Sequence, residues 1–281
     1  MKRPAGTRGH IVPFAIVLAG ILLLFVPALA AQLTDKDVAR RPVWEQFLRE
    51  AKVVRAETLA EGVTKPKRLW LKKGDLEACA VWKRPAETGA DHFDRWEHEI
   101  AAYRLDKLLG LNMVPPTIER SYHGYAGSLQ LWVELEFNGL QIQKDGIGTP
   151  GPKQEAYEKA RSLQRAFDSL IANADRTLQN LRYTGDWRMI LIDHSQSFRD
   201  TPPYIGRLLF GRSGDSSLQA FNRLPRTFLA KVRALTHEKI RAAVEDYMTS
   251  SEIDAVLNRR DLLLQEVEAL VKELGEDRVL Y

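Results

Sequence analysis

One stretch of the chain, residues 167–198, has Asp175, Asn180 and Asp193 at a spacing that strongly restricts the fold. Asp175 is followed five positions later by Asn180, and Asp193 directly follows a predicted buried strand, Trp187 to Ile192. A loop, a hairpin and a strand in this order would place two carboxylates and one amide around one cleft, as Mg²⁺-nucleotide chemistry requires. Taken singly, each residue is also typical of an ordinary turn, where Asp and Asn cap the backbone.

A lysine at the end of a predicted strand is the second informative feature. Segments 68–72 and 76–83 are predicted as the two strands of a hairpin, and the second strand ends in Lys83. In phosphoryl transfer, such a lysine neutralises the α- and β-phosphates while backbone amides of a glycine-containing turn lie over them. Gly62 lies in the turn before this hairpin and is the predicted phosphate-binding turn residue. Most lysines at strand ends are simply solvated, so the functional interpretation depends on the acidic residues downstream.

An amphipathic helix is predicted over Asp91 to Leu109, with Gly110 as its C-cap. Lys83 would need a carboxylate to hold it, and this helix offers Glu97 and Glu99 in its N-terminal half. Residues two apart do not share a helix face, so only one of them can face the strand. We expect Glu99 to be the inward residue; the alternative is that both are solvated helix charges.

The first 31 residues have the pattern of a secretory signal peptide. Lys2, Arg3 and Arg8 precede an apolar run from Ile11 to Ala30, which ends in the small-residue site Ala28-Leu29-Ala30. The run is nearly long enough to cross a bilayer, so an uncleaved membrane anchor is the alternative. In both cases we expect an exported chain that is periplasmic, extracellular or in the lumen of the secretory pathway, and membrane-anchored if the segment is retained.

Charge and cysteine content narrow the range of partners. The N-terminal segment contributes three basic residues to the formal net charge of +4, so the remainder has no net basicity that would indicate nucleic acid. Cys79 is the only cysteine, which excludes an internal disulfide, and we expect it to be a small buried apolar residue. The histidines show no spacing typical of a metal site.

The order of predicted elements divides the chain into two lobes. Residues 32–137 combine strands with one helix, residues 138–152 are rich in turn formers and are predicted as a flexible connection, and residues 153–281 are mainly helical. Further elements are predicted as a helix over 44–54, strands over 117–122 and 128–136, and helices over 154–174, 226–247 and 253–274. The sequence therefore predicts an α+β fold with a small strand-rich N-lobe and a mainly helical C-lobe.

Two segments of the chain resemble known kinase families. The sequence EIAAYRLDKLLGLNMVPP, from Glu99 to Pro116, is similar to the corresponding helix of the Golgi secretory-pathway protein kinases. The sequence NADRTLQN, from Asn173 to Asn180, with Ile192-Asp193 after it, resembles the same family and the phosphatidylinositol 3/4-kinase-like kinases, and more loosely the HipA-type toxin kinases. The resemblance extends over about residues 62–198 and implies a bilobal, protein-kinase-like fold.

The resemblance also implies a role for each matching residue. Lys83 would contact the nucleotide phosphates, and Glu99 would position Lys83. Asp175 would be the catalytic base, while Asn180 and Asp193 would hold Mg²⁺ or Mn²⁺. ATP would therefore lie between the lobes, and its γ-phosphoryl group would face Asp175.

Other residues are expected to support this site. The backbone of Val133 to Glu136, including Glu134, is the predicted hinge against the adenine. Asp168 and Asn173 are expected to brace the catalytic loop, and Arg176 to pair with a nearby carboxylate.

These features predict an exported ATP-dependent phosphotransferase acting on a hydroxyl of a protein, a lipid headgroup or a sugar. A protein acceptor fits the Golgi-kinase resemblance, and a lipid or sugar fits the phosphatidylinositol-kinase resemblance. The alternative is a kinase-fold pseudoenzyme that binds a nucleotide or a partner without turnover.

Overall fold

The structure is a computed structural model that describes residues 33–60, 65–84, 94–212 and 220–281. The predicted signal segment and the predicted turn residue Gly62 lie outside the described residues, so both stay predictions. Within the described part of the chain, no helix combines the length and the apolar character needed to cross a membrane.

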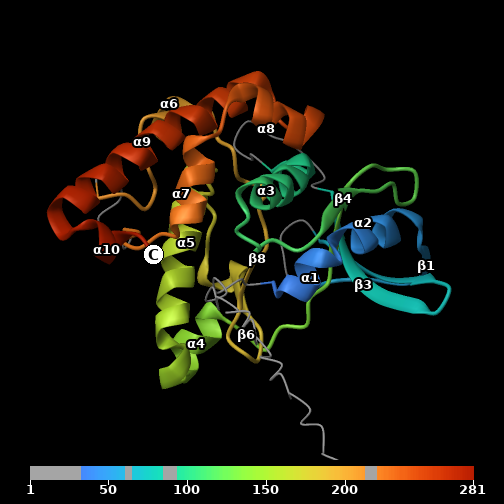
Figure 1. The fold of residues 1–281 in the computed structure, drawn as a ribbon. Helices are drawn as coiled ribbons and strands as arrows, with labels where there is room; N and C mark the ends of the chain where they lie inside the picture. Colours follow the sequence, from blue (N-terminus) through green and yellow to red (C-terminus); the bar gives the residue numbers. More distant parts are fainter. Residues whose placement is uncertain (1–32, 61–64, 85–93, 213–219) are drawn as a thin grey trace, which may run out of the picture.

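A five-stranded antiparallel sheet dominates the N-terminal half (Figure 1). Its strands follow the order β1-β2-β3-β5-β4. They are β1 (Lys52–Thr58), β2 (Lys67–Lys73), β3 (Leu76–Lys83), β4 (Thr117–Glu119) and β5 (Ser128–Leu131). The predicted hairpin of β2 and β3 is present, and Gly74 in its turn has a φ of 60°, a conformation that favours glycine.

The helix predicted over residues 44–54 is shorter than the sequence pattern indicates. Helix α2 (Arg41–Glu50) ends at Glu50 because Ala51 is extended, with φ −64° and ψ 141°, and the chain continues as β1. Val53 and Val54 continue the apolar spacing of the helix, but β-branched residues favour strands, and here they join the edge of the sheet.

The two faces of the sheet have different environments. One face packs under α2 and forms a small core whose members are Phe47, Leu48, Ala51, Leu69, Leu71, Ala80, Trp82, Ile118 and Leu129. Successive side chains of a strand point to opposite faces. Lys83 directly follows the buried Trp82, so its side chain emerges on the other face of the sheet.

Helix α3 (Trp96–Leu109) contacts both the sheet and the helices of the C-terminal half (Figure 1). It ends at Gly110, which adopts the left-handed conformation with φ 70°, as the sequence predicts. The fully buried Asp106 fixes this end of the helix. Its carboxylate accepts hydrogen bonds from Arg41 Nη2 at 2.8 Å and from the backbone amide of Met113 at 2.7 Å. Asp106 therefore ties α2, α3 and the chain leading to β4 together.

Helices form most of the C-terminal half. They are α4 (Gly139–Asp145), α5 (Gln154–Leu170), α6 (Pro202–Ile205), α7 (Arg226–Arg233), α8 (His237–Val244), α9 (Ser250–Leu274) and α10 (Glu276–Val279), after the short α1 (Asp35–Ala39) of the N-terminal half. A small antiparallel sheet of β6 (Phe137–Asn138), β7 (Leu181–Tyr183) and β8 (Met189–Leu191) lies beside them. The larger hydrophobic core joins α3, α5, α7, α8 and α9.

Turn-forming residues act as helix caps at two places where the predictions differ from the structure. Residues 138–152 are predicted as a flexible connection, but they contain α4, which Asn138 caps and Gly146 ends at φ 62°. The single helix predicted over residues 226–247 is divided into α7 and α8, because the Thr236 side chain caps the start of α8.

Candidate active site

A buried ion pair joins the sheet to helix α3. Lys83 Nζ lies 2.7 Å from Glu99 Oε1, and the Glu99 side chain is only 2% exposed. Burial would raise the pKa of Glu99, but the Lys83 ammonium holds that pKa well below its ordinary value. Glu97 lies elsewhere on the helix, where its Oε2 atom is 3.7 Å from Arg95 Nε. The structure thus pairs Lys83 with Glu99, the glutamate expected to face inward.

Lys83 also contacts Asp193, which follows β8 in the other half of the chain. The distance from Nζ to Asp193 Oδ1 is 2.9 Å. Burial would lower the pKa of Lys83, but the carboxylates of Asp193 and Glu99 raise it above its ordinary value. Asp193 has a φ of 65°, which is uncommon for a residue other than glycine. Strained backbone of this kind clusters at functional sites.

Asp175 and Asn180 lie in the loop between α5 and β7, and polar groups of the loop fix its shape. The Asp175 amide donates to Asn173 Oδ1 at 3.2 Å, and Asn180 Nδ2 donates to the Asp175 carbonyl at 3.1 Å. Burial, together with the negative charges of Asp193 and Asp94, raises the pKa of Asp175 above its ordinary value. The two aspartates predicted to share a cleft therefore lie within electrostatic reach of each other.

Arg176 holds this loop against strand β8. Its Nε and Nη2 atoms donate to the two carboxylate oxygens of Asp168, on α5, at 2.9 and 3.0 Å. Its Nη1 atom donates to the carbonyls of Ile192 and Asn180 at 2.6 and 3.2 Å. Because Ile192 directly precedes Asp193, this buried guanidinium fixes the loop of Asp175 relative to Asp193. The bracing predicted for Asp168 and Arg176 is present in the structure.

His194 was not predicted as a residue of the site. It contacts Arg176 of the Arg176–Asp168 ion pair and Glu99 of the Lys83–Glu99 ion pair. Its Nε2 atom lies 2.9 Å from Arg176 Nη2. A guanidinium can only donate, so Nε2 accepts and Nδ1 carries the proton. The His194 backbone amide donates to Glu99 Oε2 at 3.1 Å. Burial lowers the pKa of His194, so the ring is neutral between Arg176 and Glu99.

Asp94 and Ser195 form a second contact that the sequence analysis misses. Ser195 Oγ donates to Asp94 Oδ1 at 2.7 Å, and the Arg95 amide donates to the Ser195 carbonyl at 3.0 Å. The start of α3 is thereby attached to the segment that follows Asp193. The only local signal is an Asp just before a helix, which is common at helix N-termini and does not indicate its distant partner.

The predicted hinge bridges the large and the small sheet. The Trp132 amide donates to the Cys79 carbonyl of β3 at 2.9 Å, and the Glu136 amide donates to the Tyr183 carbonyl of β7 at 2.8 Å. The side chain of Glu134 between them is exposed, so its predicted contact with adenine through the backbone stays a prediction. Cys79 is half-buried rather than fully buried as predicted, because it lies on the same face of β3 as Lys83.

Asn180 and Asp193 offer the kind of ligand that Mg²⁺ and Mn²⁺ prefer. Both supply oxygen donors, one from an amide and one from a carboxylate. Among the described residues, no three His, Cys, Asp or Glu side chains form a group that could hold a metal ion. Mg²⁺ in nucleotide sites is usually held by one or two carboxylates together with substrate phosphates and water. The donors present fit an ion of that kind.

Comparisons with solved structures identify the fold. No protein-family model matches the sequence, and no curated protein matches it significantly. A structure of hydra Fam20 with sugar matches with a TM-score of 0.62 and 18% identity, covering 90% of this chain and 95% of the other. The Golgi casein kinase matches at 14% identity over 87% of this chain and 79% of its own, with TM-scores of 0.59 and, with Mn/ADP bound, 0.60. The chain therefore has an atypical kinase fold, α+β and similar to that of Fam20 and the Golgi casein kinase, as the sequence predicts.

Proposed function

We propose that this chain is an exported ATP-dependent phosphotransferase that transfers the γ-phosphoryl group of ATP to a hydroxyl of a protein, a lipid headgroup or a sugar. The observation that carries the proposal is the convergence of distant residues on Lys83. Glu99 comes from α3 and Asp193 from the end of β8, and both contact the same ammonium group. Charges in partly buried positions cost free energy, and strongly shifted pKa values are typical of functional sites.

The residues present have complementary roles in such a reaction. The acceptor oxygen would form a bond to the γ-phosphorus while the bond from that phosphorus to the β-phosphate oxygen breaks. Asp175 would orient the hydroxyl and take its proton. Lys83, held by Glu99, would neutralise the α- and β-phosphates. A nucleotide-bound Mg²⁺ or Mn²⁺, held by Asn180 and Asp193, would supply charge neutralisation during transfer.

The similar structures guide the choice of acceptors for an assay. One is named as a casein kinase and another was solved with a sugar. Protein and sugar hydroxyls are therefore the first acceptors to test, followed by lipid headgroups.

Nucleotide binding is the direct test of this proposal. At 100 times its dissociation constant, Mg²⁺-ATP should stabilise the folded chain by about 2.7 kcal/mol and raise the melting temperature accordingly. The titration is measured by thermal shift with ATP in Mg²⁺, in Mn²⁺ and in EDTA. The shift should be largest with a metal ion present. An unchanged melting temperature at millimolar ATP in both metals would contradict the proposal.

Export has a separate test. We expect the protein from its native host to begin after Ala30 or Ala31, because the small-residue site lies there. Mass spectrometry of the intact protein from soluble and membrane fractions measures the terminus. A chain that retains Met1 or Lys2 in the membrane fraction would show an anchor instead.

A further inference from the structure

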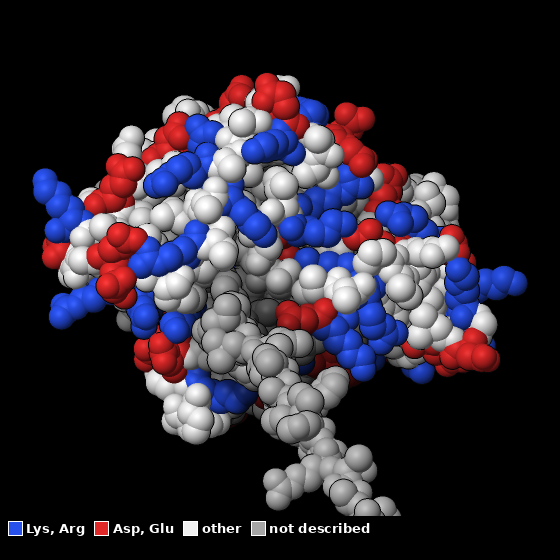
Figure 2. Space-filling view, in the orientation of Figure 1, with Lys and Arg blue, Asp and Glu red and all other residues white. Residues whose placement is uncertain are grey.

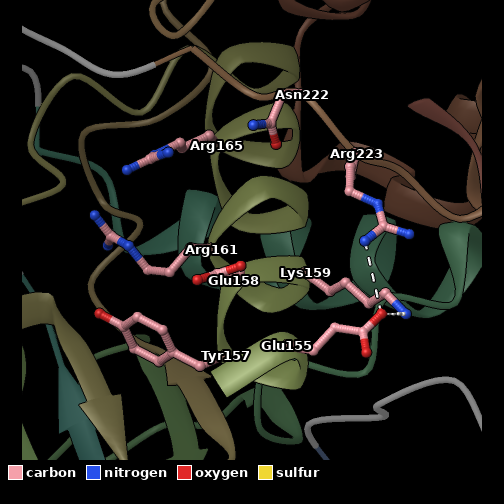
Figure 3. A pocket seen from close by; sticks show the side chains of 8 residues that line it. All are labelled: Glu155, Tyr157, Glu158, Lys159, Arg161, Arg165, Asn222 and Arg223. Carbon is pink, nitrogen blue, oxygen red and sulfur yellow. Dashed lines mark ion pairs between the residues drawn. The ribbon is translucent and has the colours of Figure 1, made fainter. Parts of the chain in front are cut away.

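One arginine of the C-terminal half is set apart from the basic residues of the surface. Lys and Arg are interspersed with Asp and Glu over the face shown in Figure 2. In the cavity along α5, the carboxylate of Glu155 pairs with Lys159 at 2.8 Å and with Arg223 at 3.6 Å (Figure 3). Arg259, in the middle of α9, differs because its side chain is fully buried, and it has no part in the proposed reaction.

Backbone carbonyls hold the guanidinium group of Arg259. Its Nε atom donates to the carbonyl of Leu170 at 2.9 Å. Its Nη1 atom donates to the carbonyls of Arg199 at 2.9 Å and of Tyr204 at 3.3 Å. Leu170 ends α5, Arg199 lies between Asp193 and α6, and Tyr204 lies in α6. Helix α9 contacts both α5 and α6, and this one side chain ties the three segments to it (Figure 1).

Stability alone does not account for an arginine at this position. A charged group that leaves water loses free energy unless a charged partner and hydrogen bonds replace its hydration. Burial lowers the pKa of Arg259 to about 10, and the carboxylate of Asp200 opposes this shift only in part, so the group stays charged at neutral pH. Its Nη2 atom is buried and has no hydrogen-bond partner among the described residues. An apolar side chain of similar volume would fill the same space without these costs.

The segments that Arg259 joins also meet directly, at a place where the backbone of both is strained. The amide of Phe198 donates to the carbonyl of Ile171 at 2.5 Å. Ala172 has a φ of 49° and Phe198 a φ of 63°, which is uncommon for residues other than glycine. Such backbone costs free energy and persists only where the surrounding contacts hold it. Arg259 supplies two of these contacts, to the residue just before Ile171 and to the residue just after Phe198.

Residues 196–204, called the 196–204 segment below, lie beside the proposed catalytic base. Burial raises the pKa of Asp175, and the Arg199 guanidinium is one of the positive groups that oppose this rise. The same guanidinium lies 5.1 Å from the centre of the Tyr204 ring. Arg259 therefore holds the backbone of two residues whose side chains meet. The acceptor hydroxyl must reach Asp175 in the proposed reaction, so the position of this segment matters for the acceptor.

We propose that Arg259 is a positioning residue for phosphoryl transfer, a role that rests on the proposed function. It fixes the 196–204 segment against the loop of Asp175 and thereby sets the place from which the acceptor hydroxyl reaches this carboxylate. It acts through backbone carbonyls and contacts neither the nucleotide nor the acceptor. The groups assigned to the nucleotide are held by other contacts, since Glu99 and Asp193 both pair with Lys83. Loss of Arg259 should therefore affect the acceptor more than ATP.

Steady-state transfer from Mg²⁺-ATP, with casein as the first acceptor, tests this proposal in the full chain and in Arg259→Met. Methionine is an unbranched apolar side chain that fills irregular space, and it removes every donor of the guanidinium. The ratio kcat/KM for the acceptor should fall at least about tenfold, because a misplacement of about 1 Å can cost on the order of 100-fold. The KM for the acceptor should rise, while the KM for Mg²⁺-ATP stays unchanged.

Hydrogen exchange reports on the same variant without turnover. Amides of the 196–204 segment and of residues 171–180 should exchange faster in Arg259→Met, because both segments lose a contact that holds them. Amides of β3 and α3 should exchange as in the unmodified chain.

Two further variants separate positioning from general stability. Arg260→Met removes the next arginine of α9, whose Nη1 atom donates to the Leu235 carbonyl between α7 and α8 at 2.5 Å, and both KM values should stay unchanged. Arg259→Lys keeps the charge but has a single donor atom, so its KM for the acceptor should lie between those of the unmodified chain and of Arg259→Met. This variant also carries the test if Arg259→Met does not fold.

The proposal is overturned if the Arg259 variants keep the KM for the acceptor and the exchange rates of both segments. It is also overturned if kcat falls only in proportion to the unfolded fraction, as it would for an arginine with a purely structural role. Failure of the proposed function looks different, because the unmodified chain would then transfer phosphate to no acceptor, and the role of Arg259 would fall with it.

Discussion

Replacing Asp175 with asparagine should lower the rate of phosphoryl transfer by roughly 10²- to 10⁴-fold, the usual contribution of a positioned acid or base. Asparagine keeps the size of the side chain, and the loop contacts made by the Asp175 backbone amide and carbonyl do not depend on the carboxylate. Nucleotide affinity should therefore stay nearly unchanged. Transfer from labelled ATP to protein, sugar and lipid acceptors, and to the chain itself, measures the rate, and calorimetry measures the affinity.

A matched substitution separates this effect from a general loss of charge. Asp145→Asn changes an exposed aspartate at the end of α4 and should leave the transfer rate unaltered. Equal rates for the Asp175→Asn variant and the unmodified chain would exclude Asp175 as the base. If the unmodified chain binds Mg²⁺-ATP but transfers phosphate to no acceptor and not to water, the pseudoenzyme is the better description.

Local sequence patterns were sufficient for the parts of the fold that depend on periodicity. The β2–β3 hairpin follows from alternation around Gly74, and α3 follows from its apolar spacing and the Gly110 cap. In the structure, these two elements bring Lys83 and Glu99 into contact. The geometry of a helix face showed only that Glu97 and Glu99 cannot both face Lys83. The choice of Glu99 agrees with the family resemblance, and the structure pairs it with Lys83.

Boundaries and long-range contacts were less predictable for a physical reason. Val53 and Val54 fit a helix face and a strand equally well, and the pairing of Val53 with Leu71 of β2 decides between them. Thr236 is an acceptable helix residue by pattern, yet its side chain caps α8 and divides the predicted helix. In both cases tertiary context selects one of two local options.

Tertiary context also explains why some residues of the candidate site were not predicted from the sequence. His194 bonds to Arg176 and Glu99, and Ser195 bonds to Asp94, across sequence separations that no local pattern encodes. These contacts satisfy polar groups buried beside the ion pairs, which would otherwise cost free energy. They can be recognised only after the fold has brought α3 against the end of β8.

Substitution of Asp193 has the second large expected effect. Asp193→Ala should remove the metal-dependent part of ATP binding, because this carboxylate is the charged member of the proposed metal-ligand pair. Changing a residue that only supports a metal ligand usually costs 10- to 100-fold in metal affinity, so loss of the ligand itself should cost at least about 100-fold. Asp193→Asn is the companion variant, since asparagine tolerates the φ of 65° at this position better than alanine does.

Lys83→Met is the comparison variant for Asp193→Ala. It tests whether the loss of ATP binding in Asp193→Ala is due to loss of the metal ion. The lysine would contribute one charge among several to the phosphates, so its loss should weaken ATP binding less than Asp193→Ala does, while most of the transfer activity is lost. Calorimetric titrations with ATP in Mg²⁺ and in EDTA separate the two cases. Lys83→Met should keep a clear difference between Mg²⁺ and EDTA, and the Asp193 variants should show almost none. If Asp193→Asn and Asp193→Ala retain the full Mg²⁺-dependent affinity, the ion is held by other residues, and the assignment of Asn180 and Asp193 fails with it.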